Sequence, residues 1–165
     1  MTHALGQIRD HIDPRDFQRF ATTEEVQAAP PVMDLRPEYP PVYDQLQLGS
    51  CVSNGVAAIV QADQIKQGEI PVMPARLFIY YLARVIEHSI QSDAGAQIRD
   101  GVKAIAKTGW CPETDWPYNI QTFEGPPPAA CSKDSATRKA IQYQRVQNSE
   151  TQIDATVASG FGVVF

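Results

Sequence analysis

The sequence predicts a mainly helical α+β fold. Three segments with apolar residues at helical spacing, 50–67, 75–87 and 96–107, predict the helices, and an all-apolar run at 162–165 predicts a strand. Of the 165 residues, 43% are hydrophobic and the mean hydropathy is -0.28, so the chain is large and apolar enough to form one core. One globular domain is therefore the expected architecture.

The first predicted helix begins beside a cysteine. Ser50 has the side chain of an N-cap, an apolar stripe at helical spacing follows it, and Gly68 is suited to end the helix. Cys51 is therefore expected in the first turn of a long helix.

The next two helices differ in how much of their surface is apolar. The segment 75–87 follows Pro74 and is apolar around most of its circumference, so we expect it to be buried. The segment 96–107 is apolar on one face only, and Gly101 within it indicates a close backbone approach. Together these helices should form the core.

The two ends of the chain differ from this middle. Residues 1–30 are polar and punctuated by proline, which predicts an extended arm with a short helix over 16–20 or 23–28. A weaker helix with Thr151 as N-cap is expected over 152–159. The apolar run after it needs neighbouring strands, and few are predicted upstream, so the chain should stop in the middle of a structure.

Charge and composition exclude several classes of function. The formal charge is -5 and the pI is near 5.1, with acids and bases mixed along the chain, so we expect no nucleic-acid partner. The apolar runs are too short to cross a bilayer and the first ten residues lack an apolar signal core, so no membrane partner is expected. A cytoplasmic protein, or one secreted without a leader or as a mature form, fits these features.

The cysteines do not form a metal-binding pattern. Cys51, Cys111 and Cys131 are odd in number and include no C-x-x-C pair, which argues against a zinc cluster and against a dense disulfide framework. We therefore expect no metal and no other cofactor. Cys111 and Cys131 lie 20 residues apart across a proline-rich loop, and two interpretations stay open, a disulfide or two unpaired thiols.

Two features of Cys51 indicate acyl-transfer chemistry. A helix N-terminus favours the thiolate, which is the nucleophilic form, and its backbone N–H groups can stabilise an oxyanion. Gln45, six residues upstream, has a side-chain amide that can be a second oxyanion donor. A buried cysteine that only fills the core is, however, the more common use of this residue in a helix.

A set of motifs around Cys51 resembles the mature start of the papain-like cysteine peptidases. The motifs are Val32-Met33-Asp34-Leu35-Arg36-Pro37, Pro41-Val42-Tyr43-Asp44-Gln45 and Gly49-Ser50-Cys51. The resemblance implies that Cys51 is the nucleophile, and that Gln45 and the backbone N–H of Cys51 form the oxyanion hole. The patterns Asp44–Cys51 and Arg76–Tyr81 are most similar to the bacterial and viral branch of that family.

The resemblance continues to the last residue and implies a division of the chain. The segment Ser92–Ala96 resembles the glycine-containing segment that binds an extended substrate backbone, which implies substrate contacts from Asp93, Ala94, Gly95 and Ala96. Residues 31–160 would be the helical, left-hand papain-like domain with its long Cys-bearing helix. Residues 161–165 would be the first strand of a missing β-rich domain.

The chain also departs from the family pattern. Leu48 and Val52 stand where the family signature has a second cysteine and an aromatic residue. Leu46 stands where the family usually has glycine, which puts the geometry of the oxyanion hole in doubt.

The histidines decide what the isolated chain is expected to do. A cysteine peptidase needs a histidine base and an Asn or Asp to orient it. His3, His11 and His88 do not stand in the family's context, and we expect all of them at the surface. The expected function is a cysteine-type peptidase that hydrolyses peptide bonds, inactive as this isolated chain because its base is absent.

Two expectations about function and partners remain. The alternative to the peptidase is a non-catalytic module that binds peptides or a partner protein. In either case the partner would be a peptide or protein, and an uncovered face of the Cys51 helix would be covered by a second copy or a second fragment.

Overall fold

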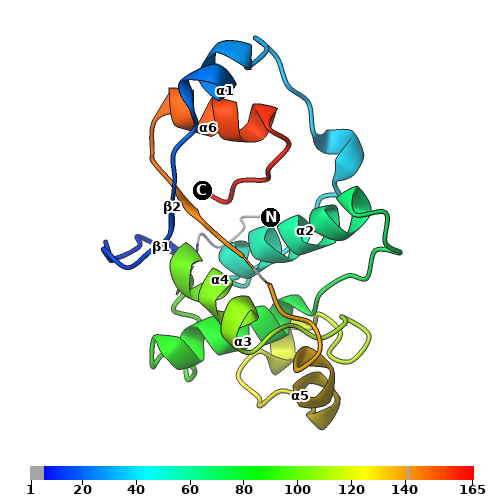
Figure 1. Ribbon diagram of the computed structural model, residues 1–165. Helices are drawn as coiled ribbons and strands as arrows, with labels where there is room; N and C mark the ends of the chain where they lie inside the picture. The colour runs from blue at the N-terminus through cyan, green and yellow to red at the C-terminus, as the bar shows by residue number, and fades with distance from the viewer. Residues whose placement is uncertain (1–5, 141) are drawn as a thin grey trace.

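The computed structural model describes residues 6–140 and 142–165, and its core consists of three helices. These are α2 (Cys51–Lys66), α3 (Arg76–Ile86) and α4 (Ile98–Lys107), which pack against one another in all three pairs. Figure 1 shows them crossing in the middle of the molecule. The fully buried side chains of α3 lie at the centre of the core, so the helix-rich α+β fold class is confirmed.

Shorter elements surround this core. They are α1 (Thr23–Ala28), α5 (Ala129–Ser135), α6 (Glu150–Ala158) and the 3₁₀ turns η1 (Arg36–Glu38) and η2 (Ile120–Thr122). The first and last helices, α1 and α6, lie side by side at one end of the molecule, whereas α5 lies at the opposite end (Figure 1). Helices from the N-terminal and C-terminal parts of the chain therefore meet on one side of the core.

The strands are short and attach the N-terminal arm to the body. β1 (Gln7–Ile8) pairs in parallel with β3 (Ala96–Gln97), and β2 (Gln18–Arg19) pairs in parallel with β4 (Arg145–Val146). Each pair joins the arm to a segment that lies far away in the sequence. The described part of the arm is thus fixed to the body at two places.

The expected helices form, with shifted starts in two of them. The third begins at Ile98 instead of Ala96 because Ala96 and Gln97 pair with β1. The fourth begins at Glu150, since Ser149 accepts the capping hydrogen bond from the Gln152 N–H and Thr151 does not.

The short helix of the arm forms at 23–28, the second of its two expected places. Thr22 and Glu25 form a capping box at its start, with reciprocal side-chain bonds to each other's backbone N–H. The first place, 16–20, contains β2 instead. In the region expected to be loop, 110–131, the helix α5 begins at Ala129.

The expectation of a strand at 162–165 is wrong for the chain as described. These residues have no assigned secondary structure and pair with no strand among the described residues. The side chain of Val164 packs against α2 near Gly55 instead.

The disulfide that the sequence left open is present. Cys111 and Cys131 are bridged with a Cα–Cα distance of 4.9 Å, and both are fully buried. The bridge joins α5 to the segment before Glu113, whose backbone N–H bonds to the Met73 carbonyl. Cys51 is a free thiol. Within the described ranges no helix is both long and apolar enough to cross a membrane.

Candidate active site

The site is built around the start of α2. Cys51 is the first residue of this 16-residue helix and is partly exposed. Ser50 occupies the N-cap position but makes no side-chain cap, so that expectation is wrong in detail. The Ser50 hydroxyl instead lies 2.6 Å from the Tyr118 hydroxyl, and Asn54 Nδ2 donates to both the Ser50 carbonyl and its Oγ.

A tight loop connects Gln45 to Cys51. The Gln45 amide Nε2 donates to the Leu48 carbonyl at 3.1 Å, within the same loop. Leu46 has a φ of 56°, the left-handed conformation that glycine adopts most easily, and its N–H donates to the Asp44 carboxylate at 2.8 Å. A non-glycine residue therefore occupies the left-handed position of this loop.

The expected substrate segment lies against this loop. The Asp93 carboxylate accepts hydrogen bonds from the Gly49 N–H at 3.0 Å and from the Tyr80 hydroxyl at 2.5 Å. Gly95 has a φ of 78° and donates its N–H to the same hydroxyl. Ala94 is exposed and Ala96 is buried. Asp93 thus joins the expected substrate segment to the residues just before Cys51.

The N-terminal arm occupies the groove between these two segments. The Gly6 carbonyl accepts a hydrogen bond from the Ala96 N–H at 2.7 Å. A Cβ at Gly6 would lie 1.8 Å from the Gly49 oxygen, and one at Gly95 would lie 2.0 Å from the Gly6 oxygen. The three glycines therefore cross with no room for side chains. Sequence reasoning missed this arrangement, because Gly6 is a single glycine in a polar arm with no motif around it.

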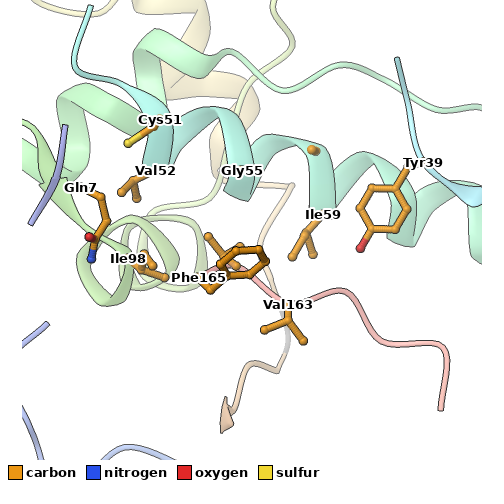
Figure 2. A pocket seen from close by; sticks show the side chains of 11 residues that line it. Gln7, Tyr39, Cys51, Val52, Gly55, Ile59, Ile98, Val163 and Phe165 are labelled. Carbon is orange, nitrogen blue, oxygen red and sulfur yellow. The ribbon is translucent and has the colours of Figure 1, made fainter. Parts of the chain in front are cut away.

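A pocket of about 260 Å³ opens beside Cys51. It is lined by Gln7 of β1, Tyr39, Ile98, five residues of α2 (Cys51, Val52, Gly55, Ala58, Ile59) and the run Val163–Phe165. Figure 2 shows Cys51 at one end and Tyr39 at the other, with Gly55 and Ile59 between them. Most of these groups are apolar, so one face of the Cys51 helix is open and hydrophobic.

None of the described histidines lines this pocket. His11 and His88 are exposed, and His88 ends α3 with a φ of 56°. His3 lies outside the described residues. Over residues 6–140 and 142–165, no group of three or more His, Cys, Asp or Glu side chains is arranged to hold a metal ion.

Two buried arginines of α3 were missed by sequence reasoning. Arg76 donates to the Asp44 carbonyl beside Gln45, and Arg84 donates to the carbonyls of Ile90 and Ser92 beside the substrate segment. Burial lowers the pKa of the Arg84 guanidinium. A charged residue inside an otherwise apolar helix is the sequence signal that could have identified both.

Sequence and structure comparisons identify the relatives of this chain. No family model matches it. It is 40% identical over 131 residues to an uncharacterized peptidase C1-like protein of Acanthamoeba polyphaga mimivirus. It also superimposes on xylellain, a cysteine protease from Xylella fastidiosa, with a TM-score of 0.86 and 38% identity over 94% of this chain. By sequence and by fold, the chain is a relative of the papain-like, C1-type cysteine peptidases.

The relatives of this papain-like chain are a viral and a bacterial protein, as the sequence motifs predicted. The chain covers only part of the length of each. It spans 42% of the mimivirus protein and 63% of xylellain. A structure solved for the mite allergens Blo t 1 and Der p 1 shares the fold alone, with a TM-score of 0.53 and 17% identity over 76% of this chain.

Proposed function

We propose that this chain forms the Cys-bearing wall of a papain-like cysteine peptidase. Cys51 would be the nucleophile, and Gln45 and the Cys51 backbone N–H would be the oxyanion donors. One observation carries the proposal: a free, partly exposed thiol begins a long helix beside an open pocket, and Gly49, two residues before it, bonds to Asp93 of the 93–96 segment. The names of the relatives support the same reaction class.

The proposed reaction needs a nucleophile, oxyanion donors and a base, and the described residues around Cys51 would provide the first two. The thiolate attacks the peptide carbonyl carbon, the carbonyl oxygen becomes negative, and hydrogen-bond donors stabilise that charge. A base must first take the thiol proton and later give it to the leaving amine. No described histidine lines the pocket of Cys51. We therefore expect that the isolated chain does not turn over peptides.

The proposed substrate is an extended peptide. β3 already pairs with an extended segment, β1, through the Ala96 N–H, so its backbone groups suit a peptide of similar conformation. A peptide or protein partner is part of the proposed reaction; the net charge of -5 supports the expectation of no nucleic-acid partner, and the short apolar runs support that of no membrane partner. The open apolar face of α2 would be covered by a second copy or a second fragment.

A second candidate function is a non-catalytic module that binds peptides. The lack of a described histidine in the pocket favours it, together with backbone groups that hold an extended segment without any chemistry. The two candidates differ in one property, the reactivity of Cys51 towards an acyl group.

Acylation of Cys51 tests both candidates. The isolated chain would be mixed with a peptide p-nitrophenyl ester, whose good leaving group needs no protonation, and the protein mass and nitrophenol release would be measured. Cys51→Ala is the control for labelling at that thiol. The peptidase proposal expects a covalent acyl adduct on Cys51 without turnover of an amide. Peptide binding by fluorescence anisotropy with no adduct would favour the binding module, and neither signal would refute both.

A further inference from the structure

Two side chains, the buried Arg76 and the partly buried Tyr118, hold the backbone of the loop that carries Gln45. Arg76 Nη1 donates to the Asp44 carbonyl at 3.1 Å, and the Tyr118 hydroxyl donates to the Gln45 carbonyl at 2.9 Å. The same hydroxyl lies 2.6 Å from Ser50 Oγ. The loop is therefore fixed at its Gln45 end and at its Cys51 end by one cluster.

Arg76 is itself held in a single orientation. Its Nη2 and Nε donate to the Glu113 carboxylate at 2.7 and 3.3 Å, and its Nη1 also donates to Asn54 Oδ1 of α2 at 3.0 Å. The guanidinium carbon lies 3.9 Å from the centre of the Tyr118 ring and 5.1 Å from that of Tyr43. Arg76 is only 8% exposed. Its planar guanidinium has hydrogen-bond partners along its edges and aromatic rings packed against it, so its orientation is fixed.

The loop needs such support because its backbone is strained. Leu46 is left-handed at φ 56°, a conformation that costs a residue with a Cβ free energy. Strained backbone of this kind persists where the surrounding structure fixes it. The bonds to the carbonyls of Asp44 and Gln45, the two residues before Leu46, supply that fixation.

We propose that Arg76 and Tyr118 are positioning residues that hold residues 44–50 so that Gln45 stays in a fixed relation to Cys51. Neither side chain is assigned a contact with substrate, so neither is a catalytic residue. The effect on chemistry rests on the proposed peptidase function, whereas the effect on the loop does not. The two effects therefore need separate measurements.

The first measurement is the hydrogen exchange of the loop amides. Tyr118→Phe removes one hydroxyl and keeps the ring against Arg76, and loss of the hydroxyl's bonds to the Gln45 carbonyl and to Ser50 Oγ should speed exchange across residues 45–50 at least about tenfold. Tyr43→Phe is the matched control, because its hydroxyl bonds to Gln61 and not to the loop. Exchange in the Tyr118→Phe loop equal to that of the control would overturn the proposal, whatever the protein's activity.

The second measurement separates positioning from thiol reactivity. It uses the Gly6→Ala background, in which the crowded arm is expected to leave the groove more often. N-acetylglycinal adds its carbonyl carbon to the thiol sulfur, and the carbonyl oxygen takes up the proton, so the adduct places an oxygen near Gln45. Iodoacetamide alkylates the same sulfur by displacing iodide and places no such oxygen there.

The two reagents should respond differently to Tyr118→Phe. We expect the affinity for the aldehyde to fall about tenfold, with the alkylation rate unchanged within about twofold. Arg76→Lys, which keeps the charge and loses the fork, should have the larger effect on the aldehyde. Equal affinities in Tyr118→Phe and its parent would refute the link to chemistry. A parent protein that forms no aldehyde adduct would refute the proposed peptidase function. The hydrogen-exchange data would still test whether Arg76 and Tyr118 hold the loop.

Discussion

The substitution Gly6→Ala tests whether the N-terminal arm controls access to Cys51. An added Cβ would lie 1.8 Å from the Gly49 oxygen, whereas carbon and oxygen normally approach to about 3.3 Å. The arm must therefore move by roughly 1.5 Å, which breaks the 2.7 Å bond between the Gly6 carbonyl and the Ala96 N–H. Overpacking and the lost hydrogen bond together should cost roughly 2–4 kcal/mol.

That cost predicts a large change in how often the arm leaves the groove. Roughly 2–4 kcal/mol corresponds to a roughly 30- to 700-fold higher population of the open arm. Two readouts report it: the rate at which a bulky maleimide labels Cys51, and the hydrogen exchange of the Ala96 amide. Both should increase in Gly6→Ala.

The control is a glycine with room for a methyl group. At Gly125 the nearest atom to an added Cβ is the Thr122 oxygen at 3.4 Å, an ordinary contact, so Gly125→Ala should leave both readouts unchanged. If Gly6→Ala keeps the labelling rate and the Ala96 protection of the wild type, the arm does not occupy the groove in solution.

Three further predictions concern the ion pairs of Arg99 with Asp13 and Asp16 of the arm, the disulfide, and the left-handed residue His88. Hydrogen bonds from Arg15, assisted by the charge of Arg99, hold the pKa of Asp13 far below its ordinary value. The stabilisation from these contacts is thus complete above the ordinary pKa of about 3.9 and is lost only as the pH falls through the lower folded pKa. The rate at which a protease cleaves the arm should then be the same at about pH 7 and about pH 5, and it should be higher in Arg99→Ala at both pH values. Faster cleavage of the wild type at about pH 5 than at about pH 7 would contradict this reasoning. Cys111→Ser opens the disulfide and should lower the free energy of unfolding by about 3 kcal/mol, measured with urea, and an unchanged midpoint would contradict a native bridge. His88→Gly should raise that free energy by about 1 kcal/mol, because His88 is exposed and left-handed at the end of α3, and a lower melting temperature would argue against that conformation.

The helices around the site could be predicted from the sequence because their signals are local. The periodic apolar stripe after Ser50 and the apolar circumference of 75–87 specify α2 and α3 within one or two residues. The start of α4 could not be predicted in the same way, since Ala96 and Gln97 leave the helix to pair with an arm almost ninety residues earlier. Pairing between distant segments overrides the local pattern.

In the candidate site, too, features with a local sequence signal could be predicted, and features that depend on distant segments could not. Cys51 and Gln45 could be identified from their spacing and from the motifs beside them. The crossing at Gly6 depends on where the arm lies in space, which no local signal specifies. The strand expected at 162–165 was wrong for a related reason, because apolar residues are compatible with a strand but do not supply its partner.

The polar residues inside α3 have a mechanical consequence. Arg76, Tyr80 and Arg84 are spaced four apart and so lie along one face of the helix. Through these three side chains, α3 bonds both to the loop before Cys51 and to the segment around Asp93. If α3 slid or tilted, the loop before Cys51 and the segment around Asp93 would move together with it. The position of α3 therefore sets the distance between the two segments that border the groove.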